Sequence, residues 1–374
     1  MRAAHNILHL GIKELRSLLR DRMLLVGIIV AFTVFVYASA TATPETLSRA
    51  PIAIVDEDQS QLSQRIASAF YPPAFMPPAT ITSSEVDSGM DAGLYTFALD
   101  IPPDFQRDVL AGRSPAIQLN VDATRMSQAF TGSGQIQSII MGEVNEFAQG
   151  NRAAATLPVD LALRARFNPE LNASWFTAMM QVIDQITMLS IILTGAALIR
   201  EREHGTVEHL LVMPVTPFEI MAAKVWSMGL AVLVAAAFSL TFVVQGALSV
   251  PIEGSVLLFL AGATLHVFAT TSMGIFMGTI ARSMPQFGLL LFLAIMPLQI
   301  LSGGMTPRES MPDLVRTLML GAPNTHFVIL GQAILFRGAG FSVVWPQFAA
   351  LAVIGTALFA LSLARFRKTL GTMA

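Results

Sequence analysis

The densest run of charge outside the N-terminal segment is Arg200–His209 (REREHGTVEH). Acids and bases gathered in one short segment can pair with complementary charges on another protein, so the run is a candidate docking face. The alternative interpretation is a solvated loop that only joins two helices. His204 and His209 do not indicate a metal site, because a five-residue offset does not place both imidazoles on one helical face.

A helix start follows the charged run. Thr216 suits the N-cap position, Pro217 suits the first helical position, and Glu219 completes a capping box with Thr216. We therefore expect a short helix to end near Pro214 and a second helix to begin after Thr216. Together they predict a charged elbow over residues 200–224, between two apolar segments.

Polar side chains inside apolar segments are a second set of candidates, because a polar group in a bilayer is costly and is by default a functional hypothesis. Gln181, Asp184 and Gln185 share one helical face. These three residues line a cavity or subunit interface, or else Asp184 is a hydrogen-bonded acid near the lipid headgroups. His266 either hydrogen-bonds across helices or lines a pathway.

Small residues at a four-residue spacing follow His266 on the same segment. Gly274 and Gly278, extended backwards by Thr270, form a small-xxx-small pattern. Such a pattern lets two membrane helices approach closely. We expect this pair to lie at a helix interface.

No arrangement of residues indicates an enzyme. The sequence has no cysteine, no G-x-x-x-x-G-K-[ST] loop for ATP and no H-E-x-x-H zinc motif. Asp56, Asp58 and Asp122 lie near predicted strand ends, where aspartates are typical turn formers rather than a catalytic pair. We assign this chain no catalytic residue, metal ligand or bound cofactor, and expect the energy for any transport to come from another subunit.

The composition indicates a membrane protein that must position these candidates. Hydrophobic residues make up 53% of the 374 residues and charged residues only 13%, against about 25% in soluble domains. A bilayer span needs about 20 mostly apolar residues. The candidate spans are Met23–Ala42, Phe176–Ile199, Val225–Leu248, Val256–Ile280, Phe287–Leu301 and Pro346–Leu363.

Residues 1–22 precede the first span and mix Lys13, Arg16 and Arg20 with leucines and isoleucines. This pattern is typical of an amphipathic helix on a membrane surface. A signal peptide is the alternative, because positive charges, an apolar run and Ala38-Ser39-Ala40 imitate its regions. The apolar run is long for that purpose, so we expect a retained anchor over 23–42.

Residues 43–174 lack a spanning run and alternate predicted strands with predicted helices, which indicates an α/β domain. The expected strands are Ala50–Val55, Tyr95–Ile101 and Ala116–Val121, and the expected helices are Ser60–Phe70, Pro103–Ala111 and Ser127–Ala148. The predicted fold class is a polytopic α-helical membrane protein with six transmembrane helices. One helix precedes the inserted α/β domain and five follow it, over 175–374. Residues 306–342 are too polar to span in full and predict short helices at the outer surface.

Basic residues in short loops predict the orientation. With the N-terminus inside, the cytoplasmic loops hold all three lysines, Lys13, Lys224 and Lys368, and most of the arginines in short loops. The short outer connections hold only arginines, namely Arg308, Arg316 and Arg337. We therefore expect both termini to be cytoplasmic and the 43–174 domain to be extracytoplasmic.

The elbow also carries a recognisable pattern. Residues 201–214 read E-R-E-x-G-T-x-E-x-L-x-x-x-P and are followed by Glu219 and Lys224. This stretch resembles the signature of ABC-2 type transporter permeases. Further stretches resemble the multidrug-export branch of that family, and the likeness extends over essentially the whole chain. They are Ala53-Ile54-Val55-Asp56, Val121-Asp122-Ala123-Thr124-Arg125, Gly278-Thr279-Ile280-Ala281-Arg282-Ser283 and Leu301-Ser302-Gly303-Gly304 with Thr306-Pro307.

The resemblance implies an exporter of small amphiphilic or drug-like molecules in a bacterial inner membrane, although relatives also export lipids, glycans or ions. Two permeases, identical or related, would pair in the lipid bilayer, and each would dock on a cytoplasmic ABC ATPase that binds ATP and Mg. Relatives often work with a periplasmic membrane-fusion adaptor, and no nucleic acid is involved. ATPase coupling would then fall on Glu201, Glu203, Gly205, Thr206, Glu208, Pro214, Glu219 and Lys224.

Two other hypotheses compete with export. A non-transporting sensor or assembly factor would use its outer domain to bind a ligand or partner, but six spans are more than an anchor needs. An ion-coupled secondary transporter would carry ionisable groups in its spans, and these are scarce here. A neighbouring ATPase gene would favour the exporter.

Overall fold

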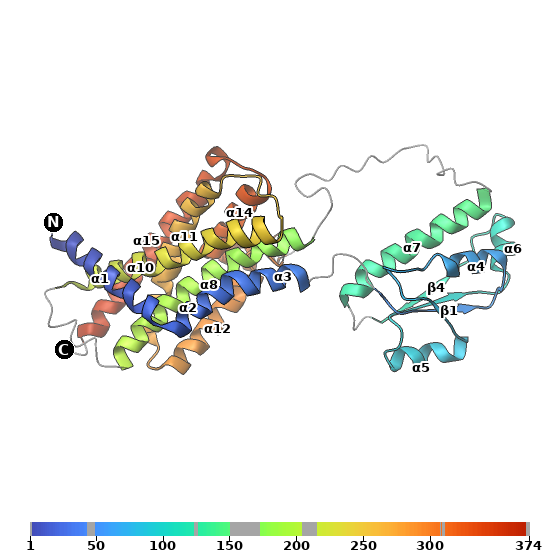
Figure 1. Cartoon of the computed structure of the whole chain (residues 1–374), viewed down its shortest axis with the longest axis horizontal. Helices are drawn as coiled ribbons and strands as arrows, with labels where there is room; N and C mark the ends of the chain where they lie inside the picture. Colours follow the sequence, from blue (N-terminus) through green and yellow to red (C-terminus); the bar gives the residue numbers. More distant parts are fainter. Residues whose placement is uncertain are drawn as a thin grey trace. The chain divides into compact units, whose positions relative to one another are not determined.

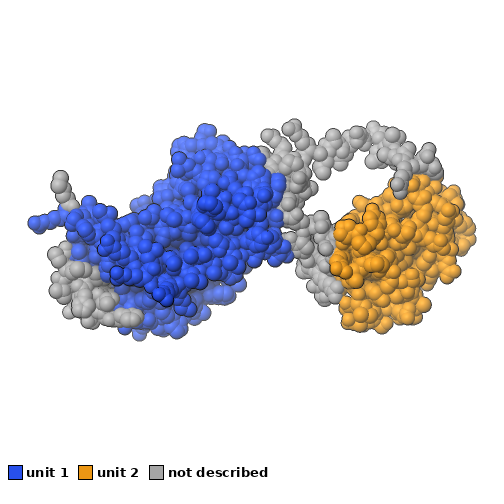
Figure 2. Space-filling model, in the orientation of Figure 1, with its two compact units in different colours: residues 1–43, 165–374 blue, residues 44–164 orange. Residues whose placement is uncertain are grey.

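The structure is a computed structural model that describes residues 2–42, 49–122, 126–149, 173–203, 215–306, 308 and 311–371. The chain forms two compact units (Figure 2). The first, here the helical unit, combines residues Met1–Thr43 with Ala165–Ala374. The second, here the sheet unit, covers Pro44–Arg164.

The helical unit is that of a membrane protein. Across the described residues, five helical stretches are long and apolar enough to cross a bilayer, or six if a bent pair counts as one span. They are Arg22–Ala42, Ser174–Glu203, Pro217–Ala247, Val256–Ile280 and Phe341–Thr369. In Figure 1 these stretches are α2 (Arg22–Val30), η1 (Ala31–Phe35) and α3 (Val36–Ala42); α8 (Ala173–Glu203); α10 (Pro217–Phe238) and η3 (Ser239–Ala247); α11 (Val256–Ile280); and α15 (Phe341–Gly371).

The predicted span Phe287–Leu301 is a shorter helix than a full crossing requires. It corresponds to α12, Met284–Ile300, whose 17 residues extend for roughly 25 Å. The hydrocarbon core of a bilayer is about 30 Å thick. The predicted count of six transmembrane helices is therefore matched in part: five stretches are long enough to cross, the bent pair would make a sixth, and α12 is shorter.

The bent pair lies in the segment 306–342. Helix α13 (Asp313–Met319) meets α14 (Pro323–Gly331) and its π-helical continuation η5 (Gln332–Phe336) at 87°. Helix α13 is largely exposed, as expected of a surface helix, but α14 is buried inside the helical unit. The prediction of surface helices fails for α14, whose Asn324 and His326 side chains form hydrogen bonds inside the protein.

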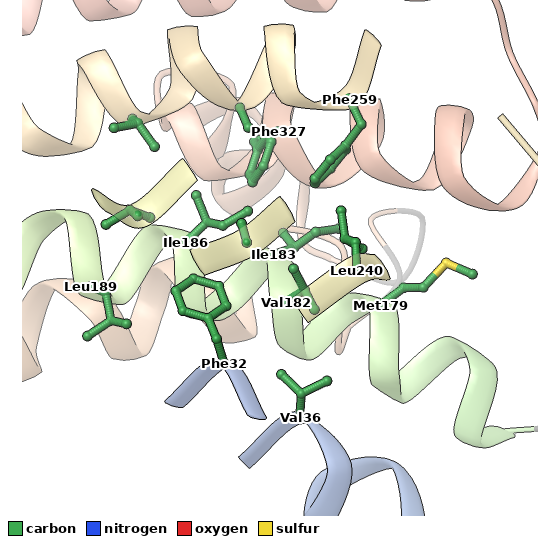
Figure 3. Close-up of a cluster of buried hydrophobic side chains, with 14 of the residues drawn as sticks. Phe32, Val36, Met179, Val182, Ile183, Ile186, Leu189, Leu240, Phe259 and Phe327 are labelled. Carbon is green, nitrogen blue, oxygen red and sulfur yellow. The ribbon is translucent and has the colours of Figure 1, made fainter. Parts of the chain in front are cut away.

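Helix α8 is the centre of the helical unit. Buried residues make up 83% of its most apolar stretch, against 28% for the first span and 17% for the last. Figure 3 shows Phe32 and Val36, from η1 and α3, pointing toward Val182 and Ile186 of α8. The helices of the unit therefore pack around α8, so a change at α8 reaches most of them.

Helix α1, Arg2–Arg20, precedes these spans and packs along α10. Its buried residues are Gly11, Glu14 and Leu18, which recur every three or four positions and so form one face. Gly11 and Leu18 are ordinary interface residues. Glu14 carries a carboxylate, and a buried carboxylate needs a partner.

The sheet unit contains a mixed four-stranded sheet in the order β2-β1-β3-β4. Strands β1 (Ile52–Asp56) and β3 (Phe97–Ile101) pair in parallel, with Ile52 opposite Phe97. Strand β2 (Ala79–Thr80) is parallel to β1, and β4 (Gln118–Val121) is antiparallel to β3.

Helices cover both faces of this sheet (Figure 1). Alternate strand residues, such as Ile54 and Leu99, pack with α4 (Gln61–Ser68), α6 (Phe105–Leu110) and α7 (Met126–Gln149). The intervening residues, such as Ala53 and Val55, pack with Val86 and Met90 of α5 (Val86–Asp91). This alternation is the two-residue period of a strand.

Candidate functional site

A buried lysine joins three helices at one end of the helical unit. Lys224, near the start of α10, donates hydrogen bonds to Glu201 Oε1 at 2.7 Å and to Glu14 Oε1 at 3.2 Å. The side chains of Lys224, Glu201 and Glu14 are only 3%, 14% and 11% exposed. We call these three residues the ion triad.

The ion triad fastens α1, α8 and α10 together, because each helix supplies one member. Removing a charge from water is costly, and the cost is offset only when the charge is well paired. Salt screens such buried charges much less than it screens surface charges. The sequence interpretation of Glu201 and Lys224 as docking charges therefore changes, since both side chains face into the protein.

Further contacts fix α1 on α10. Trp226 Nε1 donates to the Ile7 carbonyl at 3.1 Å, and Asn6 Nδ2 donates to Glu219 Oε1 at 3.2 Å. Gly11 packs directly against the Trp226 indole, where a Cβ atom would collide with the ring. The N-terminal helix is thus an integral part of this end of the unit.

The predicted helix start at Thr216 is confirmed. The Thr216 amide donates to Glu219 Oε2 at 2.6 Å, and the Glu219 amide donates to Thr216 Oγ1 at 3.3 Å. Pro217 occupies the first turn. This reciprocal capping box gives α10 a fixed beginning immediately after the elbow.

The end of α8 is fastened on its other side to the turn between α11 and α12. Arg202 Nη1 donates to the carbonyls of Ala281 at 2.9 Å and Gly278 at 3.2 Å. Glu203 Oε1 accepts from the Met284 amide at 3.1 Å. Arg202 and Glu203 therefore use their charges to cap neighbouring backbone groups.

Four of the predicted coupling residues fall outside the described residues: Gly205, Thr206, Glu208 and Pro214. The four others, Glu201, Glu203, Glu219 and Lys224, all make contacts that hold the flanks of the elbow. The structure therefore brings together the two flanks of the elbow. Glu201, Glu219 and Lys224 act there as anchors, whereas Glu203 remains exposed.

A second polar group lies deep in the helical unit. His266 Nε2 is 2.9 Å from Thr187 Oγ1, and the Thr187 hydroxyl donates to Asn324 Oδ1 at 2.8 Å. Asn324 Nδ2 then donates to the Leu298 carbonyl at 2.8 Å. The Ile183 carbonyl, 3.2 Å from Thr187 Oγ1, is a second acceptor for this hydroxyl. The chain of hydrogen bonds joins α11, α8, α14 and α12.

This network explains both His266 and the burial of α14. The His266 ring also stacks on Phe327 of α14, with 4.1 Å between ring centroids. The structure thus assigns His266 a hydrogen bond across helices, one of the two roles expected from the sequence. It also gives Asn324 the partners that allow α14 to lie inside the unit.

The two glycines of the small-xxx-small pattern lie where α11 meets α8. A Cβ atom on Gly274 would lie 2.5 Å from the Ile191 carbonyl oxygen, and one on Gly278 would lie 3.2 Å from Leu198 Cδ2. The Ser190 and Thr270 hydroxyls are 2.6 Å apart along the same seam. The predicted close approach of two helices is therefore present at this seam.

The remaining candidates line one face of α8 toward its N-terminal half. Gln181 Oε1 accepts from Ser39 Oγ of α3 at 3.3 Å. Asp184 is partly buried, and Gln185 is 4% exposed. The structure places these three side chains away from the ion triad, at the other end of the same helix.

Comparison with known proteins identifies the family. Residues 22–364 match the model of the ABC-2 family transporter proteins. The chain belongs to the ABC-2 transporter family. The inner membrane transport permease YhhJ of Escherichia coli (strain K12) is 65% identical over 374 residues, with 100% of both chains covered. The YhhJ protein of Shigella flexneri has the same identity and coverage.

More distant relatives carry a drug-related name. The probable multidrug ABC transporter permease YbhR of Escherichia coli (strain K12) is 27% identical, over 97% of this chain and 99% of its own length. Membership of the ABC-2 family makes this chain a multi-pass transporter permease of the inner membrane and not an enzyme.

Sequence reasoning missed three residues of this ABC-2 permease that hold its sites together: Glu14, Thr187 and Asn324. Glu14 left a local signal, because it is an acid on the same face of α1 as buried Gly11 and Leu18. Thr187 and Asn324 left none, since hydroxyl and amide residues recur throughout such segments. Their importance comes from partners that are distant in the sequence.

The ABC-2 permease also offers a test by pH. Asp21 caps α2 by accepting from the Leu24 amide at 3.1 Å, and it accepts from Arg200 Nη1 at 2.6 Å. The Leu24 hydrogen bond chiefly, with the help of Arg200, lowers the pKa of Asp21 below its usual value of 3.8. The charged form of Asp21 therefore stabilises the fold above that value, and the stabilisation is lost as the pH falls through the lowered pKa.

We expect Asp21→Asn to be less stable than the wild type near neutral pH, and the gap to close as the pH falls below about 4. Asparagine still caps a helix, so this change tests the charge alone. Thermal unfolding in detergent at a series of pH values measures the gap. A gap that stays constant down to the acid limit would contradict this role of the Asp21 charge.

Proposed function

We propose that this permease is the membrane subunit of an ATP-driven exporter. It moves a small amphiphilic or drug-like substrate out across the inner membrane. A separate cytoplasmic ABC ATPase binds ATP and Mg and docks on the elbow over residues 200–224. The proposal is supported by membership of the ABC-2 family and by the absence of a P-loop from the sequence.

One observation carries the proposal: the hydrogen bonds of the ion triad join both flanks of the elbow. Glu201 lies in the last turn of α8, and Lys224 lies in the first turns of α10. A movement imposed on a loosely held loop would be absorbed by that loop. A movement imposed on this elbow would pass into α8, around which the other helices pack.

The orientation that we propose places both termini in the cytoplasm and the sheet unit in the periplasm. The distribution of basic residues in short loops supports it. In this orientation the sheet unit is a plausible contact for a membrane-fusion adaptor.

We further propose that two permeases, identical or related, form the pore. Helix α12 exposes Leu289, Phe292 and Leu293, whose side chains are 62%, 58% and 60% exposed. These apolar side chains need lipid or another helix as their surroundings. A second copy and the bilayer both supply such surroundings.

The test targets the elbow without breaking the ion triad. Glu201→Arg is unsuitable, because it would place an unpaired charge in the interior. Glu208→Arg is the better variant, and we expect it to reduce recovery of the co-expressed ATPase by about tenfold in affinity purification, as for a disrupted interface charge. Membrane insertion and the amount of permease should not change.

Asp87→Arg is the matched control for the elbow variant. Asp87 is an exposed acid on α5 of the sheet unit, which we place on the other side of the membrane. This variant should keep full ATPase recovery. Normal ATPase recovery and normal substrate export by Glu208→Arg would refute coupling through the elbow.

A further inference from the structure

The N-terminal half of α8 carries hydrogen-bond acceptors that lack donors. Among the residues that the structure describes, Asp184 takes part in no hydrogen bond and no ion pair. Gln185 Oε1, next to it, is fully buried and has no donor within the described ranges. Gln181, one turn earlier on the same face, uses its Oε1 to accept from Ser39.

Acceptors without donors in such surroundings need positive charge. A carboxylate held away from water is costly unless a cation pairs with it or a proton neutralises it. A buried carbonyl oxygen without a donor adds to this cost. The face formed by Asp184 and Gln185 is therefore incomplete without a bound cationic group or a proton.

The surroundings indicate what kind of cation fits. Met188 and Ile192, one and two turns after Asp184 on the same face of α8, are apolar and only partly buried. Calcium takes 6–8 oxygen ligands and magnesium requires near-octahedral geometry. Within the described residues there is no group of three or more histidine, cysteine or acidic side chains that could hold a metal ion. A hard metal ion is thus a poor match, whereas an organic cation with an apolar body suits both the charge of Asp184 and the apolar side chains on this face of α8.

We propose that Asp184, assisted by Gln185, recognises the cationic head of an amphiphilic organic substrate. The site rests on the proposed export function, for which it names the substrate class. Because Asp184 is only partly buried, part of this residue can contact such a ligand. Asp184 neutralises the head, and the neighbouring apolar side chains contact the body.

The experiment measures binding to the full-length permease in lipid nanodiscs, without any ATPase. Tetraphenylphosphonium is the cationic probe, and triphenylphosphine oxide is the neutral aromatic comparison. We expect the wild type to prefer the cation, and Asp184→Asn to weaken cation binding by about tenfold or more while the neutral compound binds as before. Asp184→Glu should keep most of the preference.

The matched control is Asp313→Asn, because the Asp313 side chain is 88% exposed on α13 and distant in the sequence. This variant should bind both probes like the wild type. If Asp184→Asn fails to fold, Gln185→Met serves instead, and we expect it to weaken cation binding by about threefold through the lost carbonyl.

Equal cation binding by the wild type and Asp184→Asn would overturn the proposal and would indicate that Asp184 only carries a proton. Equal weakening of both probes would also overturn it, because the loss would not depend on charge. The result is independent of the ATPase. If the wild-type permease recovers no ATPase, the export proposal alone is refuted, and loss of charge-selective binding in Asp184→Asn would still establish the cation site.

Discussion

Replacing Lys224 with methionine is expected to lower the free energy of unfolding by about 3–5 kcal/mol, the largest effect of any single change proposed for this permease. The substitution removes the only cation hydrogen-bonded to both Glu14 and Glu201 among the described contacts. Two buried carboxylates are then left close together without their shared ammonium group. Denaturation of the purified permease in detergent, followed by circular dichroism, measures the loss.

A combined variant separates charge from packing at the same place. Glu14→Gln and Glu201→Gln together with Lys224→Met remove every charge of the ion triad while keeping similar volumes. We expect the combined variant to recover much of the stability, because uncharged buried groups carry a far smaller desolvation cost. If it is as unstable as Lys224→Met alone, the shape of lysine rather than its charge holds the helices together.

Replacing Gly274 with leucine is the second change with a large expected effect. Even the Cβ atom would lie 2.5 Å from the Ile191 carbonyl oxygen, and Thr194 Oγ1 is in contact as well. Backbone atoms cannot turn away as a flexible side chain can, so α8 and α11 must separate. Overpacking of this kind costs about 1–3 kcal/mol or more, and separation also strains the Ser190–Thr270 hydrogen bond.

Gly288→Leu is the matched control for the seam. Gly288 lies within α12, and a Cβ atom there meets no atom within 4 Å. Leucine has a higher helix propensity than glycine, so this variant should be as stable as the wild type or more stable by up to about 1 kcal/mol. The prediction for the seam is wrong if both variants unfold at the same denaturant concentration.

Local sequence patterns predicted the elements that depend on local physics. The capping box of Thr216 and Glu219 acts over three residues, so its chemistry can be read directly. The amphipathic α1 and the apolar spans follow from periodicity and length. Strands β1 and β3 were located within two residues of their bounds by their buried runs.

Elements that depend on distant partners could not be predicted in the same way. Strand β2 has two residues and exists only because β1 lies beside it. Helix α14 was expected on the surface, because nothing near Asn324 shows that Thr187 and the Leu298 carbonyl will satisfy its amide. The partners Glu14 and Lys224 are 210 residues apart in the sequence, and only the fold brings them together.

The π-helical segments have a mechanical consequence. η3 ends the α10 stretch at the end far from the elbow, η1 interrupts the first span, and these two segments contact each other and α8. π-helical turns interrupt the regular α-helical hydrogen-bond pattern and occur frequently at functional sites. The ion triad holds one end of α8, whereas η1 and η3 contact the rest of this helix. We therefore expect amide hydrogen exchange to be slowest at the end of α8 that the ion triad holds, and faster near η1 and η3.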